Sequence, residues 1–186
     1  MTSFYSRDEL ENIGFAKVGE DVLVSKKASI YAEHKIELGN HVRIDDFCVL
    51  SGKLILGDYI HISAYVGLFG GNTGIECEDF STISSRTMVY AESDDYSGMS
   101  MTNPMVPEKF RGVYAGKVVL KKYSIVGTGC TILPGVTLNE GAAIGAMSLV
   151  NHDVPEWTVN VGIPCKVKKE RYRNLLDKCT EFIKTM

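Results

Sequence analysis

LKKYSIVGTGCTILPGVTLNEGAAIGAMSLV, residues 120–150, carries an aliphatic side chain at every sixth position. The same spacing begins at residue 38, slips by three residues near Gly70–Asn72 and continues to residue 89. A period of six matches neither an α-helix, with about 3.6 residues per turn, nor a single strand, which alternates about every two residues. The positions that share this spacing are Leu38, Ile44, Leu50, Leu56, Ile62, Leu68, Cys77, Ile83, Val89, Leu120, Val126, Ile132, Leu138, Ile144 and Val150.

A second series of small or branched residues follows four positions behind the first. If the first and fifth residues of each hexad point inward and the third and fourth turn a corner, three hexads close one triangular coil. Stacked coils then bury an apolar column that no single coil could bury alone. We therefore expect an all-β solenoid; a sandwich with irregularly spaced strands is the alternative, and the constant phase disfavours it. The second series is Val42, Cys48, Leu54, Ile60, Val66, Ser81, Thr87, Ser124, Cys130, Val136, Ala142, Ser148 and Val154.

The composition fits one globular domain spanning residues 1–186. The chain is 45% apolar and 23% charged, which suffices for one sizeable core. A net charge of −3 without a dominant basic cluster outside the C-terminal region argues against nucleic-acid binding. The sequence has no apolar run long enough to span a membrane and no basic-then-apolar leader, which predicts a cytoplasmic protein without membrane insertion. Five cysteines without C-x-x-C spacing argue against a disulfide framework.

Helical patterns occupy both ends of the repeat region, 18–167. Residues 1–17 are predicted to form an N-terminal helical cap, with Ser6 as N-cap, Glu9 completing a capping box and Gly14 ending the helix. Apolar residues recur every three to four positions near the C-terminus, in a stretch without glycine or proline, which predicts a C-terminal helix over 168–186, with its body from about Lys169 to Lys184. Each helix could cover an open coil end or contact a neighbouring subunit.

The six-residue phase breaks between residues 93 and 117, and we expect an excursion loop there. A long aperiodic loop in a compact repeat domain is usually functional. The alternative is a surface insertion that only packs on a neighbouring subunit.

The phase of the hexads separates the four histidines. His41 and His152 fall at corners, and His34 precedes the regular repeat. His61 falls at the sixth place of its hexad and should project outward from a flat face. Asp94 also falls at a sixth place, on a different face, so the two residues could approach each other only across a subunit interface.

The hexapeptide pattern resembles the hexapeptide-repeat acyltransferases, which are left-handed parallel β-helices. Within them, Tyr59–Ile62, Phe69–Gly71, Asp94–Gly98 and Thr102–Pro104 are similar to the maltose/galactoside O-acetyltransferase-like branch, and most to acetyltransferases of O-antigen and capsule sugar pathways. The resemblance implies a homotrimer with intersubunit active sites. In that branch a loop at this place carries a catalytic histidine, but here the corresponding residue is Asp94.

Acetyl transfer needs a base for the acceptor proton and a donor for the developing oxyanion. We assign His61 as the base, with Asp94 or Asp95 as its partner or as a ligand of the acceptor sugar. His61 could instead be a packing residue at a trimer interface, and the two aspartates could serve only the turn chemistry of the loop. The residues expected to bind the acceptor are Asp95, Tyr96, Asn72 and Asn103.

Val161–Val167 is similar to the Gly-x-Pro-Ala-Lys turn that lies beside the coenzyme A arm in this superfamily, with Cys165 in place of alanine. Basic residues after this turn would attract the coenzyme's phosphates, although a solvated helix start is the alternative. An uncrowded outward surface near Gly145 would leave room for pantetheine. The residues expected to contact the coenzyme are Gly145, Ala146, Gly162, Pro164, Lys166, Lys168 and Arg171.

We therefore expect an acetyl-CoA-dependent acetyltransferase that acts on a sugar hydroxyl or amine, nucleotide-linked or in a glycan precursor, in surface polysaccharide biosynthesis. Acetyl-CoA would be the co-substrate, and no metal would be required. One alternative is a non-catalytic solenoid subunit that binds partners. Another is a zinc enzyme of the γ-carbonic anhydrase type, which would need three converging histidines that the hexad phase does not supply. The acceptor, and the choice between O- and N-acetylation, stay open.

Overall fold

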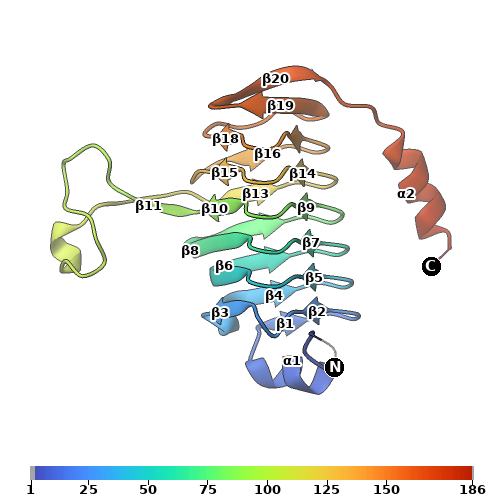
Figure 1. Cartoon of the computed structure of the whole chain (residues 1–186), viewed down its shortest axis with the longest axis horizontal. Coiled ribbons are helices and arrows are strands. Elements are labelled where there is room, and N and C mark those ends of the chain that lie inside the picture. Colours follow the sequence, from blue (N-terminus) through green and yellow to red (C-terminus); the bar gives the residue numbers. More distant parts are fainter. Residues whose placement is uncertain (1–2, 186) are drawn as a thin grey trace.

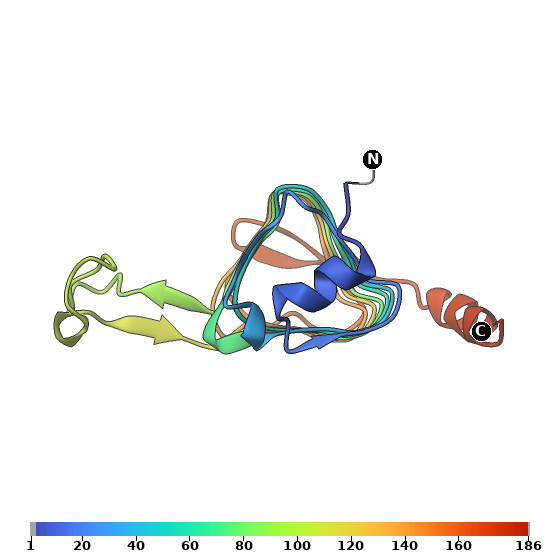
Figure 2. The same cartoon turned by 90° about the horizontal axis from the view of Figure 1, so that it is seen from below.

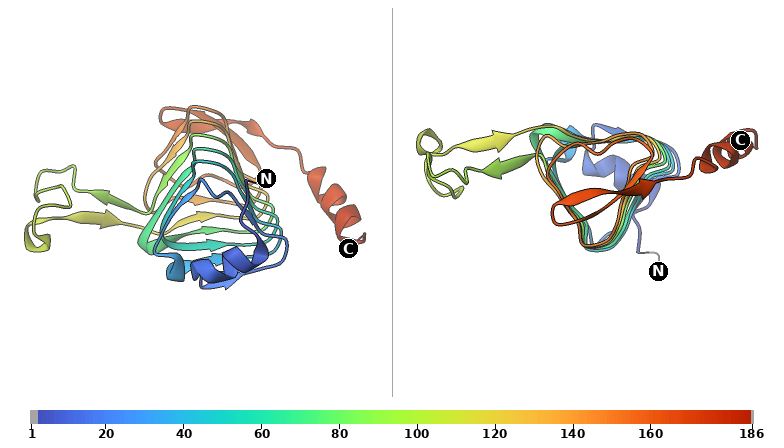
Figure 3. Two further views of the ribbon diagram at one scale, coloured as in Figure 1. Left: turned by 60° about the horizontal axis from the view of Figure 1, so that its bottom comes forward. Right: turned by 90° about the horizontal axis from the view of Figure 1, so that it is seen from above.

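The computed structural model describes residues 3–185 and is a parallel β-solenoid with a triangular cross-section (Figures 1 and 2). Each coil contributes a short strand to each of three flat faces, and strands of successive coils pair in parallel. Seen from above, the chain turns clockwise while it rises toward the viewer, so the solenoid is left-handed (Figure 3). The fold predicted from the hexads is confirmed.

The first face lies between the corner that bears the excursion loop and the corner beside the C-terminal helix. It consists of β1 (Lys17–Val18), β4 (Ile36–Leu38), the second half of β6 (Val49–Leu56), the second half of β8 (Gly67–Cys77), β13 (Val118–Leu120) and β16 (Thr137–Leu138). The second face consists of β2 (Leu23–Val24), β5 (Arg43–Ile44), β7 (His61–Ile62), β9 (Thr82–Ile83), β14 (Ile125–Val126), β17 (Ala143–Ile144) and β19 (Thr158–Gly162). The third face consists of β3 (Ser29–Tyr31), the first halves of β6 and β8, β10 (Met88–Tyr90), β15 (Thr131–Ile132) and β18 (Leu149–Val150).

The core is the stacked column that the sequence period predicted. All fifteen residues of the first ladder are buried, none more than 3% exposed, and every residue of the second ladder is buried as well. Removing an aliphatic side chain of this size from water contributes about 1.5–3 kcal/mol. The five cysteines are free thiols, and four of them are buried.

One corner, between the first and second faces, is lined by a stack of aromatic rings. His41, Tyr59, Phe80, Tyr123 and Trp157 all have positive φ angles between 51° and 62°. Successive rings lie 4.5–6.2 Å apart, centroid to centroid. The left-handed backbone conformation is unfavourable for side chains with a Cβ, and stacking of the rings offsets that cost.

The N-terminal cap forms as predicted. Helix α1 (Arg7–Ile13) starts after Ser6, whose side chain accepts from the backbone N–H of Glu9 while the Glu9 carboxylate accepts from the Ser6 N–H. Gly14 ends the helix with φ +93°. Leu10 is buried, so the helix covers the apolar floor of the first coil.

The prediction for the C-terminal end was wrong in its boundaries. Strand β20 (Cys165–Glu170) occupies the region where a helix starting at residue 168 was expected, and helix α2 spans only Leu175–Ile183. β20 runs antiparallel to β19 because the last coil presents an unpaired strand edge that backbone hydrogen bonds can satisfy. This β19–β20 hairpin, and not α2, lies at the upper end of the solenoid, while α2 stands beside the aromatic corner (Figure 1). There Phe182 packs edge-on against Tyr59 and Phe80.

The excursion loop contains β11 (Glu92–Asp94), paired antiparallel with β12 (Val113–Ala115), and the 3₁₀ turn η2 (Glu108–Phe110). A second 3₁₀ turn, η1 (Glu33–Lys35), precedes β4. Among residues 3–185 no helix has the length and apolar character needed to cross a membrane.

The slip in the repeat anchors the root of this loop. The pairing of β6 with β8 shifts register around Gly52 and Gly71, which lie opposite each other. The Glu92 carboxylate accepts a hydrogen bond of 2.6 Å from the backbone N–H of Asn72, and the Thr73 hydroxyl donates to the carbonyl of Ala91 at 3.2 Å. The two departures from the six-residue phase are therefore one structural unit.

Replacing Gly71 with alanine should loosen the loop root and lower thermal stability. Gly71 has φ +52°, and an added Cβ would overlap the Glu92 carboxylate. The matched control is Gly98→Ala, because Gly98 also has positive φ but nothing lies within 4 Å of an added Cβ. Differential scanning calorimetry should give a clearly lower Tm for Gly71→Ala than for Gly98→Ala. Equal Tm values would show that the Glu92 contact does not anchor the loop.

Candidate active site

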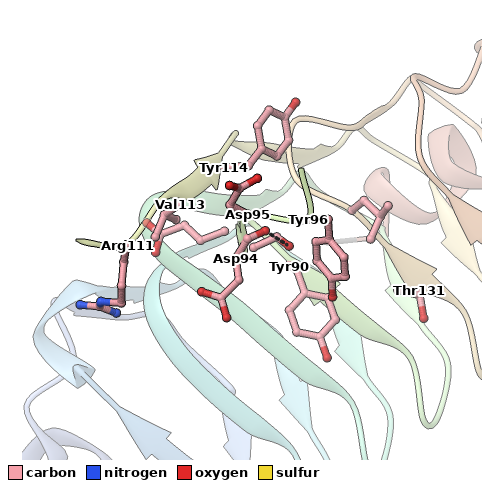
Figure 4. A pocket seen from close by; sticks show the side chains of 11 residues that line it. Tyr90, Asp94, Asp95, Tyr96, Arg111, Val113, Tyr114 and Thr131 are labelled. Carbon is pink, nitrogen blue, oxygen red and sulfur yellow. Dashed lines mark hydrogen bonds between the residues drawn. The ribbon is translucent and has the colours of Figure 1, made fainter. Parts of the chain in front are cut away.

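A large hollow lies where the excursion loop leaves the solenoid (Figure 4). It has a volume of about 1080 Å³ and joins the loop strands to the outer surface of the third face. Its lining combines three carboxylates, three tyrosines and one arginine, the mixture of polar and aromatic groups suited to a polar ligand with a flat ring. The lining residues are Tyr90, Glu92, Ser93, Asp94, Asp95, Tyr96, Arg111, Val113, Tyr114, Thr131 and Leu133.

The two adjacent aspartates of this pocket are held differently. Both carboxylate oxygens of Asp95 accept from the loop's own backbone, from Ser97 N–H at 2.7 Å and Ser100 N–H at 2.8 Å. The hydrogen bonds from Ser97 are the main cause of an Asp95 pKa below the ordinary aspartate value. Asp94 is exposed at the end of β11, paired through its backbone with Val113. Asp95 thus shapes the turn, while the Asp94 carboxylate is available to a ligand.

The other residues expected at the acceptor site are spread out. Tyr96 lines the pocket and is 94% exposed. The Asn103 side chain accepts from the backbone N–H of Met105 at 2.9 Å, which serves a turn within the loop. Asn72 lies outside the pocket lining, and its side-chain oxygen accepts from Lys35 at 3.1 Å.

His61 lies on the outer surface of the second face, as its hexad phase predicted, and is partly exposed. Its Nε2 is 2.8 Å from the Asp45 carboxylate, whose other oxygen accepts from Arg43 Nε at 2.8 Å. The sequence reasoning missed Asp45 as a partner of His61. His61 pairs with Arg43 in the coil below, and Asp45 is two residues after Arg43. A search for acidic residues one coil earlier along the chain would therefore have found Asp45.

The Asp45 carboxylate contacts Arg43, which is cationic, and His61, which can be protonated. Partial burial alone would raise the pKa of its carboxyl, but the hydrogen bonds from His61 and Arg43 outweigh burial and leave the pKa below its ordinary value of 3.8. The ionised Asp45 can therefore orient the imidazole.

The other histidines lie away from this cluster. His41 is at the aromatic corner and stacks on Tyr59, and His152 is exposed, with Nδ1 2.9 Å from the Asn151 side-chain oxygen. Within residues 3–185, no group of three histidine, cysteine or acidic side chains could hold a metal ion.

The residues expected at the coenzyme lie mostly at the upper end of the second face. Gly162 and Pro164 form the turn of the β19–β20 hairpin, and the Gly162 N–H donates to the Ser148 hydroxyl at 3.0 Å. Lys166 and Lys168 are exposed on β20. Gly145 and Ala146 follow β17 in the coil directly below.

Arg171 is separate from this group. Its Nη1 donates to the carbonyls of Tyr123 at 2.7 Å and Gly141 at 2.9 Å, and burial lowers its pKa. The guanidinium is therefore hydrogen-bonded to the backbone near the aromatic corner, where it helps to line a second hollow of about 330 Å³ beneath α2.

Proteins of similar sequence are sugar acyltransferases. The chain is 45% identical over 172 residues to dTDP-4-amino-4,6-dideoxy-D-glucose acyltransferase of Escherichia coli, covering 91% of this chain and 89% of that protein. It is 29% identical over 137 residues to the putative lipopolysaccharide biosynthesis O-acetyl transferase WbbJ of strain K12, covering 71% and 67% of the two chains. No protein-family model matches the chain.

Among solved structures, AntD, an N-acyltransferase from Bacillus cereus, superposes with a TM-score of 0.98 at 50% identity, covering the whole of both chains. AntD structures contain dTDP with coenzyme A, dTDP with 3-hydroxybutyryl-CoA, or dTDP-4-amino-4,6-dideoxyglucose with coenzyme A, and several carry substitutions at Asp94 or Ser84. This chain belongs to the hexapeptide-repeat family of sugar acyltransferases, as the sequence resemblance implied, and it is an enzyme of that class.

Replacing Asp45 with asparagine should lower the free energy of unfolding near neutral pH by about 1 kcal/mol. A carboxyl whose pKa is lowered by folding stabilises the fold above its unfolded pKa, and that contribution is lost as the pH falls through the folded pKa. The difference between wild type and Asp45→Asn should therefore be full above about pH 5 and shrink toward pH 3. Urea unfolding at pH 7 and pH 3 measures it, with exposed Asp177→Asn as the control. A difference that does not change with pH would contradict the role of the charge.

Proposed function

We propose that this enzyme transfers an acyl group from a coenzyme A thioester to the amino group of a dTDP-linked 4-amino-4,6-dideoxy sugar. The observation that carries the proposal is the agreement with AntD along the full length of both chains, together with the ligands that AntD binds. The E. coli relative is named for the same acceptor. This choice favours N-transfer over the O-transfer that the sequence left open.

Two residues of this chain support the proposal individually. AntD was studied as D94A, D94N, S84A, S84C and S84T variants, and this chain has the same residue types at both numbers. Asp94 supplies an exposed carboxylate that can accept hydrogen bonds from an amine. Ser84 is half-buried and directly follows β9. Sequence reasoning missed Ser84, because no histidine or acidic residue marks its hexad.

Asp94 and Ser84 lie on opposite sides of one chain, since β11 and β9 are well separated (Figure 1). His61 is near Ser84, because its backbone partner in the next coil is Thr82, two residues before Ser84. We infer that the active site forms between copies in a homotrimer. Asp94 of one subunit would meet Ser84 and His61 of another subunit across the second face.

In this arrangement the neutral amine attacks the thioester carbonyl, a C–N bond forms, and the C–S bond breaks to release coenzyme A as its thiol. Asp94 would hold the amino group, and the imidazole of His61, oriented by Asp45, would take the proton that the amine loses. That proton can then pass to the departing thiolate. Asp95 and Tyr96 would support the acceptor side, while Asn72 and Asn103 are better explained by their contacts within the chain.

The coenzyme would lie along the upper part of the second face. Exposed Ala146 and the neighbouring Gly145, over which Val161 packs, would border the pantetheine, and the turn at Gly162 and Pro164 would flank it. Lys166 and Lys168 would attract its phosphates. Arg171 is better assigned to the aromatic corner than to the coenzyme, because two backbone carbonyls occupy its Nη1.

The product would serve as a precursor in surface polysaccharide biosynthesis, in keeping with the lipopolysaccharide relative. We place the enzyme in the cytoplasm, where acyl-CoA is available.

A hydroxyl acceptor is the second candidate, because relatives include a galactoside O-acetyltransferase of Lactococcus lactis at 32% identity over 114 residues. Thiol release from acetyl-CoA and 3-hydroxybutyryl-CoA, with dTDP-amino sugars and simple glycosides as acceptors, distinguishes the two. Turnover with glycosides only would overturn the proposal.

Asp94→Asn and Ser84→Ala should each lower kcat/KM for the dTDP-amino sugar by about 10²-fold, because the first removes the carboxylate proposed to hold the amine and the second removes a hydroxyl beside the proposed base. Asp8→Asn, an exposed aspartate in the first turn of α1, is the matched control. Steady-state assays should be paired with size-exclusion chromatography to verify the oligomer. Near-wild-type turnover in both variants would remove these residues from the site.

His61→Ala should lower kcat by about 10²-fold at neutral pH, because the amine loses its proton acceptor. Asp45→Asn should give a smaller loss, since it leaves the imidazole in place but without its orienting carboxylate. The pH dependence of kcat in both variants separates loss of the base from loss of its orientation. If His61→Ala retains near-wild-type kcat in an intact oligomer, the base is another group.

A further inference from the structure

The guanidinium of Arg111 is a cation without a partner in the candidate pocket. Among residues 3–185, no carboxylate lies within ion-pair distance of it, and its Nε is shielded from solvent without a hydrogen-bond acceptor. It is also the one cationic residue in the lining of this pocket within the described part of the chain. A shielded Nε–H without an acceptor is unfavourable by itself, and the partly exposed guanidinium is accessible to an anionic ligand.

The backbone fixes where this cation lies. Arg111 ends η2, where its N–H donates to the carbonyl of Glu108 at 2.9 Å, and it forms a bridge with Met101 across the loop. Two residues later, Val113 begins β12 and pairs with Asp94. Arg111 therefore lies two residues before the strand that pairs with the strand of Asp94.

The two charged groups nevertheless stay apart. Figure 4 shows the Arg111 and Asp94 side chains extending in a similar direction, with the guanidinium to one side of the Asp94 carboxylate, while the Asp95 carboxylate points the opposite way. In a 4-amino-4,6-dideoxy sugar nucleotide, the amine on C4 and the diphosphate on C1 lie on opposite sides of the pyranose ring. A sugar whose amine is held by Asp94 would therefore direct its diphosphate away from that carboxylate.

We propose that Arg111 binds the diphosphate of the nucleotide-sugar acceptor and so selects nucleotide-linked sugars over free sugars. A guanidinium can hold two phosphate oxygens with parallel hydrogen bonds, which a lysine cannot reproduce. The stacked Phe69–Tyr90 pair, with ring centroids 5.0 Å apart and rings nearly parallel, borders the same pocket through Tyr90 and offers a flat surface to the base. The proposal rests on the proposed function, because it requires a dTDP-linked acceptor.

The test compares wild type with Arg111→Met, Arg111→Lys and the control Lys109→Met. Lys109 belongs to the same loop, but its ammonium lies over the Phe110 ring and it does not line the pocket. KM is measured for the dTDP-amino sugar and for acyl-CoA, and Ki is measured for dTDP and for thymidine. Circular dichroism and gel filtration verify the fold and oligomer of each variant.

Arg111→Met should raise KM for the dTDP-amino sugar and Ki for dTDP by about tenfold or more, because charge-assisted hydrogen bonds to phosphate are lost. Ki for thymidine, KM for acyl-CoA and the Lys109→Met values should change little, and Arg111→Lys should fall between wild type and Arg111→Met. Equal weakening of dTDP and thymidine, a change in KM for acyl-CoA alone, or no change would each overturn the assignment. If wild type does not acylate the dTDP-amino sugar at all, the proposed function fails, independently of Arg111.

Discussion

The stacking of coils through one apolar column governs the architecture of this protein. Each coil offers only two or three residues per face, too few to form an independent sheet, so its inward residues are buried only by the coils above and below. Parallel backbone pairing then fixes the register between coils. Because the inward residues must pack in the column, functional side chains are confined to outward positions and to the places where the six-residue phase is interrupted.

Those interruptions cooperate rather than occur independently. The slip near Gly71 produces a long, bent β8, and that bend receives the carboxylate of Glu92 at the root of the excursion loop. The loop's first residues thereby leave the solenoid in a defined direction, and Asp94 lies on a paired ribbon that begins two residues after Arg111. A solenoid can thus present a pocket without disturbing its core.

The candidate site residues of one chain lie on different faces. The second face carries His61 with Asp45, and Ser84 follows its strand β9, while the candidate pocket opens at the opposite corner. The proposed function therefore requires that copies associate to bring these groups together. The stacked aromatic rings stabilise the corner between the first and second faces, and the hydrogen bonds of Arg171 attach the C-terminal segment to it.

The solenoid, its buried ladders, the capping box at Ser6 and the outward position of His61 could all be predicted from the sequence, because each depends on a local period or a short-range hydrogen-bond pattern. The contacts between outward side chains could not be predicted in this way. Asp45 reaches His61 and Glu92 reaches Gly71 from adjacent coils, and β20 forms because a strand edge is exposed above it. The phase of each hexad determines whether a side chain points inward or outward. Which outward side chains contact each other depends on how many residues each coil contains and on where the loop folds.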